Sequence, residues 1–326
     1  MRKIILPAAF ALLSAWSAST PAAAPDRSLA IVQTDAGLVL QDVATPLPGP
    51  GEVRVRVVAA GVNPVDWKRQ SRIPGFDVSG VVEAVGTGVT GPRPGDAVIA
   101  WVTGGYAEYA LAKADEVVSK PAGFTFAQAA GVPIAGVAAW RAVSEVALQR
   151  GQRVVVVGAA GGTGEATVQL AKARGAQVVA VGHSSQRAFL EALGVAAFVA
   201  YDKDDVAAKV GSVDAAINLV DGQATAALGY VKRGGRFSSI AGAPDAAVLA
   251  ASGVQAVVIA GPTYQGVSIG DSLRGLARAA TEGRYSVTVT RLLPLAEAAT
   301  AQQLARTGQS IGKTVLVVDP VMAGRH

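Results

Sequence analysis

The residues best suited to chemistry in this chain of 326 residues form a glycine cluster between an apolar strand and a helix. The run 154–164 is VVVVGAAGGTG, a variant of the G-x-G-x-x-G spacing with four glycines in its last seven residues. Glycines tolerate positive φ and let backbone N–H groups approach a pyrophosphate at the start of the following helix. Because the order is strand, turn, helix, we predict a dinucleotide-binding turn made of Ala160, Gly161, Gly162, Thr163 and Gly164.

The end of the second predicted strand bears on which dinucleotide is bound. A site for NAD usually has Asp or Glu about 20 residues after the glycines, where it binds the ribose hydroxyls. No acid occurs over residues 166–190, which offer Ser184, Ser185 and Arg187 instead. These side chains suit a 2′-phosphate through hydrogen bonds and charge, so we predict NADP(H). The alternative is a Ser cap followed by a solvated Arg, and we interpret His183 as a bystander.

The elements that must position these residues change in type along the chain. Up to about residue 120 the pattern is mostly β with many turns, and the alternation in Glu52–Val58 predicts a strand that covers a core on one face. Phe126–Leu148 is Ala-rich and predicts one helix. Short strands then alternate with helices, which indicates a parallel sheet with crossover helices. The expected strands are 153–157, 177–181, 197–201, 215–220 and 235–240, with helices over 164–174 and 185–193.

Composition excludes several classes of site. The chain has no Cys and two His, which rules out disulfides, Cys zinc sites, iron–sulfur clusters and thiol nucleophiles, and leaves too few imidazoles for a multi-His metal site. We therefore expect no metal. The net charge of +5 is spread, without a basic run interleaved with aromatics, so we expect no nucleic-acid partner.

The N-terminus has the pattern of a secretory signal peptide. Arg2 and Lys3 precede the apolar stretch 4–16, and mostly small residues follow to residue 24. We predict a signal peptide over 1–22 and an exported protein, periplasmic or secreted; the alternative is a cytoplasmic protein with a frayed N-terminus. The apolar stretch of about 13 residues is shorter than the roughly 20 of a bilayer-spanning helix, so we expect no stable membrane span.

Several separated motifs, in order, resemble the zinc-independent branch of the medium-chain dehydrogenase/reductase superfamily, the quinone and enone oxidoreductases. They are GVNPVDWK (61–68), PGFDVSGVVEAVG (74–86), GGYAEY (104–109), the glycine turn and the closing GKTVL (312–316). The resemblance implies an α/β fold with a GroES-like β domain over 28–124 and 285–320. A Rossmann domain, a doubly wound parallel sheet that binds NADP(H), would occupy 125–284. The final strand, 313–318, would return to the β domain.

The resemblance also implies roles for individual residues. Asn63 would lie near the nicotinamide ribose, Lys68 near the substrate carbonyl and the cofactor phosphates, and Tyr201 beside the 2′-phosphate. Zinc-dependent relatives carry Gly-His-Glu where this chain has Gly-Phe-Asp at 75–77, and a Cys near Asn63. The implied reaction is hydride transfer from NADPH to a quinone or an α,β-unsaturated carbonyl, by a homodimer.

Departures from the family pattern support a second hypothesis. The loops after Lys68 and after Asp96 are short, and Ala138 stands where relatives commonly carry a Thr that meets the carboxamide. A more open cleft excludes water less well. The alternative is therefore a non-catalytic NADP(H)-binding module with a sensor or structural role.

Overall fold

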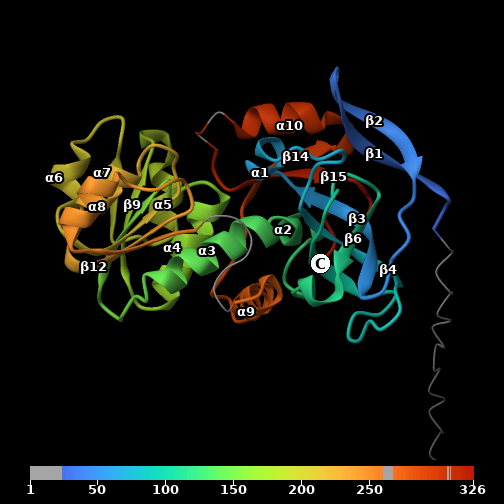
Figure 1. Cartoon of the computed structure of the whole chain (residues 1–326), viewed down its shortest axis with the longest axis horizontal. Helices are drawn as coiled ribbons and strands as arrows, with labels where there is room; N and C mark the ends of the chain where they lie inside the picture. Colours follow the sequence, from blue (N-terminus) through green and yellow to red (C-terminus); the bar gives the residue numbers. More distant parts are fainter. Residues whose placement is uncertain (1–23, 260–266, 307, 309) are drawn as a thin grey trace, which may run out of the picture.

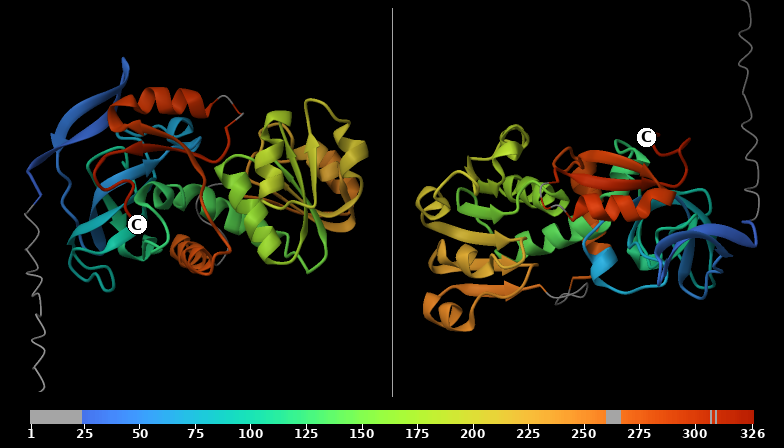
Figure 2. Two further views of the ribbon diagram at one scale, coloured as in Figure 1. Left: turned by 180° about the vertical axis from the view of Figure 1, so that it is seen from behind. Right: turned by 90° about the horizontal axis from the view of Figure 1, so that it is seen from above.

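A computed structural model of the chain describes residues 24–259, 267–306, 308 and 310–326. These residues form two lobes that lie side by side, with a long helix running between them (Figures 1 and 2). None of the described helices is long and apolar enough to cross a lipid bilayer. The predicted signal peptide, 1–22, lies outside the described residues, so export stays a prediction.

One lobe is built on a parallel sheet of six strands in the order β10-β9-β8-β11-β12-β13. Its central strands are apolar because helices cover both faces. The strand order reverses between β8 and β11, the switch point at which doubly wound sheets bind ligands at their carboxyl ends. The strands are β8 (Arg153–Val157), β9 (Gln177–Gly182), β10 (Ala197–Ala200), β11 (Val213–Asn218), β12 (Val231–Ser239) and β13 (Gln255–Val258).

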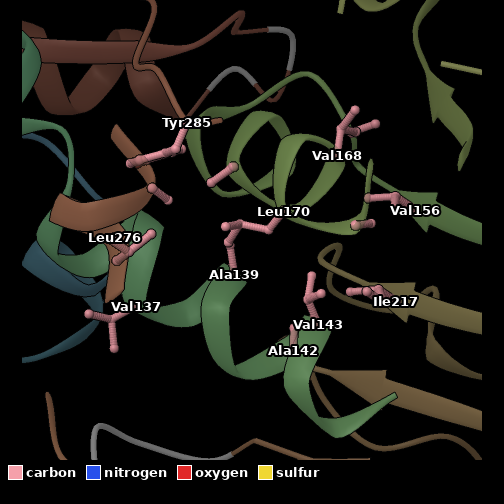
Figure 3. Close-up of a cluster of buried hydrophobic side chains, with 14 of the residues drawn as sticks. Val137, Ala139, Ala142, Val143, Val156, Val168, Leu170, Ile217, Leu276 and Tyr285 are labelled. Carbon is pink, nitrogen blue, oxygen red and sulfur yellow. The ribbon is translucent and has the colours of Figure 1, made fainter. Parts of the chain in front are cut away.

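Two hydrophobic clusters lie on opposite faces of this sheet. Figure 3 shows the larger one, in which α3 (Pro133–Glu145) and α4 (Gly162–Ala173) pack side chains against β8 and β11. The other face is covered by smaller helices. These helices are α6 (Val206–Val210), α7 (Ala224–Gly229) and α8 (Ala246–Ser252). Helix α5 (Arg187–Ala192) lies on the first face, where Leu190 belongs to the larger cluster. All five predicted strands and both predicted helices occur in this lobe, and the predicted α/β fold class is confirmed.

The other lobe is built on a seven-stranded sheet in the order β14-β15-β3-β4-β5-β7, with β6 paired to β3. Its strands come from the chain before and after the segment that forms the six-stranded lobe. The final predicted strand occurs as β15, which pairs antiparallel with β3 and so returns to this lobe. The strands are β3 (Glu52–Gly61), β4 (Asp77–Val85), β5 (Ala97–Trp101), β6 (Tyr109–Lys113), β7 (Val117–Ser119), β14 (Val289–Pro294) and β15 (Lys313–Val317). The hairpin β1 (Arg27–Thr34)–β2 (Gly37–Ala44) and helix α10 (Ala298–Ala305) complete this lobe.

The strand predicted over Glu52–Val58 is confirmed as part of β3, but its other face is covered more than the prediction requires, because Arg54 and Val58 are buried as well. Val55 and Val57 belong to the main core of the lobe, while Val58 packs on the other face against Phe126 and Ala323. Of the polar positions in the alternating pattern, Glu52 and Arg56 are partly exposed, whereas Arg54 is buried. Arg54 is 8 % exposed and donates from Nε to Glu83 at 2.6 Å. An ion pair therefore satisfies the residue that made the pattern resemble an amphipathic strand.

The single helix predicted over 126–148 is two helices, α2 (Phe126–Ala130) and α3. Proline lacks the N–H that would continue a helix, and it is favoured at the first helical position. Pro133 therefore begins α3 after the break at Gly131. The carboxylate of Asp77 accepts the N–H of Ile134 at 2.7 Å, where the helix dipole favours a negative charge.

Helices from the middle of the chain also pack on the seven-stranded lobe. Phe126 of α2 lies in the cluster around Val58, and helix α9 (Ile269–Thr281) packs beside α3, with an added Cβ at Gly270 clashing with the backbone of Asp115. The lobes therefore share a border built from α2, α3 and α9. The domain limits predicted at 124/125 and 284/285 stay predictions.

A short helix, α1 (Val65–Lys68), carries Lys68 and is fixed to the sheet by the buried carboxylate of Asp66. Its Oδ2 accepts the N–H of Asn63 at 2.7 Å and the hydroxyl of Tyr106 at 2.8 Å. Its Oδ1 has no hydrogen-bond partner among the described residues. Burial raises the pKa of Asp66 from 3.8 to about 7, and the charge of Asp77 adds to the rise.

We expect Asp66 to make stability depend on pH. Asp66 ionises near pH 3.8 in the unfolded chain but only near pH 7 in the folded chain. Rising pH therefore lowers the free energy of unfolding by roughly 4 kcal/mol between these two pH values. Above about pH 7 Asp66 is ionised in both states and has no further effect on the pH dependence. Denaturant unfolding at several pH values should show the wild type losing stability relative to Asp66→Asn, which stays neutral.

The replacement of the exposed Asp35 by Asn is the matched control, and its stability should follow the wild type at every pH. A difference in the free energy of unfolding between Asp66→Asn and the wild type that is the same at every pH would reflect the altered hydrogen bonds and would not support the prediction. Parallel pH profiles for these two proteins would contradict the prediction.

Candidate active site

A cleft of about 1250 Å³ lies between the lobes and follows the carboxyl ends of the parallel strands. Val157 and Gly158 line it at the end of β8, and Leu219 lines it after β11, on the two sides of the switch point. Of the predicted site residues, the structure brings Asn63, Lys68, Ala160, Gly161, Gly162, Thr163, Gly164 and Tyr201 together in the lining. Ser184 and Arg187 do not line this cleft.

The glycine turn leaves an open backbone surface at the start of α4. Gly158 has φ +86°, and an added Cβ there would lie 2.6 Å from Val220. An added Cβ at Gly164 would clash with the backbone of Gly158 and Ala159. Gly161 is different, because an added Cβ there would meet nothing within 4 Å. The turn is thus tightly packed beneath and open toward the cleft.

This surface fits the pyrophosphate of a dinucleotide. The first N–H groups of an α-helix have no partner within the helix, and the helix dipole favours an anion beside them. The N-cap of α4 is Gly161, which has no side chain to occupy those groups. The start of α4 lines the cleft, so its N–H groups and Gly161 would hold the phosphates.

The amide of Asn63 is held between a buried acid and a buried cation. Its Nδ2 donates to Asp77 at 2.8 Å, and its Oδ1 accepts from Lys313 at 2.5 Å. Lys313 also donates to the carbonyl of Val62 at 3.2 Å and lies 3.5 Å from Asp77. Burial raises the pKa of Asp77, against the opposing charge of Lys313. Asn63 therefore presents one fixed orientation to the cleft.

Lys68 reaches across the cleft and pairs with the other lobe. Its ammonium donates to Asp221 at 2.7 Å, and both side chains are more than half exposed. Ion pairs this exposed contribute little to stability, so the ammonium can move to another partner at low cost. The pair places a mobile cation at the cleft mouth.

The predicted 2′-phosphate residues have other partners in this structure. Ser184 donates its N–H and its hydroxyl to Asp202, each at 2.7 Å. The hydrogen bond from the Ser184 hydroxyl lowers the pKa of Asp202, so this carboxyl is an anion at neutral pH. Arg187 pairs with Glu191 at 3.1 Å and lies over the ring of Phe198. The assignment of Ser184 and Arg187 to a 2′-phosphate remains untested.

The rest of the lining combines cations with an apolar wall. Among the described lining residues, the cations are Lys68, Arg69, Arg141 and Lys313, and the acid is Asp221. The apolar wall consists of Phe76, Trp101, Ile134, Val137 and Ala138. An excess of positive charge suits a phosphate-bearing ligand, and the apolar wall suits an uncharged organic substrate.

Sequence reasoning missed the site residues that only the fold brings to the cleft. Lys313 opens the last strand and is 4 % exposed, 250 residues from its partner Asn63. Asp221 and Asp202 follow strands of the sheet, at the edge where dinucleotides bind; Asp221 lines the cleft, whereas Asp202 only adjoins the lining residue Tyr201. That position after a parallel strand was the available signal for both acids.

Two family models match the chain, the alcohol dehydrogenase GroES-like domain over residues 49–122 and zinc-binding dehydrogenase over residues 193–316. A 2-methylene-furan-3-one reductase of Solanum lycopersicum is 31 % identical over 71 % of this chain and 66 % of its own length. A quinone oxidoreductase of Mus musculus is 39 % identical over 44 % of this chain and 48 % of its own length. The matches thus span less than two thirds of the length of each of these relatives.

Comparison of structures extends the likeness to nearly the whole described chain. The quinone oxidoreductase of Coxiella burnetii superposes with a TM-score of 0.81 at 28 % identity, over 90 % of this chain and 99 % of its own. Both lobes are thus common to the two folds. The chain belongs to the medium-chain dehydrogenase/reductase superfamily, whose members bind nicotinamide cofactors.

Proposed function

We propose that the chain is an oxidoreductase that reduces a quinone or an α,β-unsaturated carbonyl with a reduced nicotinamide dinucleotide. The observation that carries this proposal is the single cleft that joins the open glycine turn to Asn63, Lys68 and an apolar wall. The names of the relatives, quinone oxidoreductase and furanone reductase, support the substrate class. For the dinucleotide, the sequence predicts NADP(H).

The proposed reaction is independent of zinc. Phe76 stands where zinc-dependent relatives carry His. The sequence has no Cys, so the Cys ligand that those relatives carry near Asn63 is also missing. Among the described residues, no group of three His, Cys, Asp or Glu side chains could hold a metal ion. Charge that develops on a substrate oxygen must then be stabilised by cations and hydrogen-bond donors of the chain.

The residues of the cleft divide this work. When bound, the dinucleotide supplies the hydride. The N–H groups at the start of α4 hold its phosphates, and Asn63, fixed by Asp77 and Lys313, orients the ribose beside the nicotinamide. The ammonium of Lys68 leaves Asp221 and stabilises negative charge on the carbonyl or quinone oxygen. The apolar wall around Phe76 and Trp101 binds the body of the substrate.

A measurement of turnover distinguishes the proposed oxidoreductase from the alternative, a non-catalytic dinucleotide-binding module. Oxidation of NADH or NADPH is followed by absorbance with a panel of quinones and enones, on the chain without residues 1–22. Turnover with one acceptor class supports the proposal. Tight binding without oxidation by any acceptor supports the binding module, which the short loops and Ala138 favour.

Export and assembly are separate proposals. We propose cleavage after Ala22 and a homodimer, on the grounds of the N-terminal pattern and the family resemblance. The mass of the mature protein and its molar mass by light scattering test these two proposals.

We expect Gly161→Ala to weaken dinucleotide binding without unfolding the chain. Gly161 has φ −70°, which Ala adopts, and the added Cβ would project into open space on the cleft side. The Kd for the dinucleotide should rise at least about tenfold, or about 1.4 kcal/mol. Fluorescence titration measures the Kd, and the melting temperature should stay the same or rise by a few degrees, because Ala at a φ that it can adopt stabilises a fold by up to about 1 kcal/mol.

Gly123→Ala is the matched control, because an added Cβ there also meets nothing within 4 Å and the residue lies outside the cleft. It should leave the Kd unchanged. Wild-type affinity in Gly161→Ala would show that the turn does not hold the pyrophosphate.

We expect Lys68→Ala to lower kcat about 100-fold for the best acceptor, the usual loss when one donor to a developing oxyanion is removed. Because Lys68 is exposed, the melting temperature should not change. Lys113→Ala removes another exposed Lys, which lies outside the cleft, and should keep full activity. Equal kcat values for Lys68→Ala and the wild type would remove Lys68 from the mechanism.

A further inference from the structure

An acid occupies the place that the sequence assigns to a 2′-phosphate. Asp202 follows Tyr201, which lines the cleft at the end of β10. The carboxylate oxygens of Asp202 accept the N–H and the hydroxyl of Ser184. Nε2 of His183 lies 3.5 Å from the same carboxylate. Both donors that Ser184 could offer to a phosphate are therefore taken by a negative charge of the chain itself.

The strand register explains why this acid sits beside Ser184. β10 pairs with β9 in parallel, with Ala200 opposite Gly182. The residues that follow the two strands therefore meet at one edge of the sheet, and Tyr201 and His183 are in edge-to-face contact. An acid after β10 can thus reach the position that an acid at the end of β9 takes in NAD sites.

The cation expected at this position is directed elsewhere. Arg187 does not line the cleft; its guanidinium lies 4.6 Å from the centre of the Phe198 ring and donates to Glu191. The neighbouring residue that does line the cleft is Gln186, which is uncharged, 5 % exposed and hydrogen-bonded to the N–H of His183. This end of the cleft is therefore lined by the uncharged Gln186 and by Tyr201, and the carboxylate of Asp202 lies one residue beyond Tyr201, outside the lining.

We propose that Asp202 is a specificity-determining residue that selects the 2′-hydroxyl of NAD(H) and rejects the 2′-phosphate of NADP(H). The inference rests on the proposed function, since it presumes a dinucleotide in the cleft. A ribose hydroxyl can donate to a carboxylate oxygen of Asp202 while that carboxylate still accepts from Ser184. A 2′-phosphate brings its own negative charge next to Asp202 and would also have to displace Asp202 from Ser184. This proposal reverses the NADP(H) preference predicted from the sequence.

The test is a pair of titrations, NADH and NADPH, on the wild type and on Asp202→Asn. We expect the wild type to bind NADH at least about tenfold more tightly, or about 1.4 kcal/mol. Asp202→Asn keeps an oxygen for Ser184 but removes the charge, so its NADPH affinity should rise about tenfold and its NADH affinity should change little. Asp35→Asn, which removes an exposed charge elsewhere, should leave the ratio unchanged.

Salt gives a second readout that a purely structural role would not move. Repulsion between Asp202 and a 2′-phosphate is screened by salt. The Kd for NADPH divided by the Kd for NADH should therefore fall as ionic strength rises in the wild type. In Asp202→Asn this ratio should not change with salt.

The outcomes separate this proposal from the proposed function. Tighter NADPH binding that is lost in Arg187→Ala would overturn the Asp202 proposal and support the sequence-based one. Binding of both dinucleotides with a ratio that Asp202→Asn does not change would also overturn it, while leaving the oxidoreductase standing. Failure of both dinucleotides to bind would overturn the two proposals together.

Discussion

The contact between Lys313 and the glycine turn joins the two lobes at the point where the cofactor is expected. Gly162 can have no Cβ, because the aliphatic part of Lys313 fills that space. The preceding residue, Gly312, has φ +58° and donates to the carbonyl of Ala160 at 2.9 Å. The returning strand therefore begins directly on the glycine turn. The seven-stranded lobe and the start of α4 cannot move independently at this point.

The ammonium end of Lys313 extends the same constraint to the catalytic side of the cleft. A buried cation is tolerated only when it is paired and hydrogen-bonded, and Asp77, Asn63 and the carbonyl of Val62 meet that need. Asp77 in turn holds the first turn of α3, the helix that runs between the lobes. Lys313 thus couples the glycine turn, the amide of Asn63 and, through Asp77, the helix that runs between the lobes.

The parts of this protein that depend on local sequence could be predicted, and those that depend on tertiary contacts could not. The parallel sheet and the glycine turn follow from strand–turn–helix patterns within about 30 residues, the length of one βαβ unit. The break at Pro133 was readable from proline chemistry but was hidden by a long Ala-rich run. The burial of both faces of β3 depends on Phe126 and Ala323, which no local pattern brings beside it. Lys313, Asp221 and Asp202 needed the topology.

The distribution of charge along the cleft shows why the choice of dinucleotide is the hardest property to predict. Every nicotinamide dinucleotide carries the same pyrophosphate, so the cations Lys68, Arg69 and Lys313 cannot distinguish one from another. Discrimination depends on the group at the 2′ position, which we place beside the residues that follow β9 and β10. There the sequence between the glycines and Glu191 supplies Ser184, but the partner of Ser184 comes from the next strand. A search of the sequence after β9 alone therefore finds the donor Ser184 but misses Asp202, the acid after β10 that accepts its hydrogen bonds.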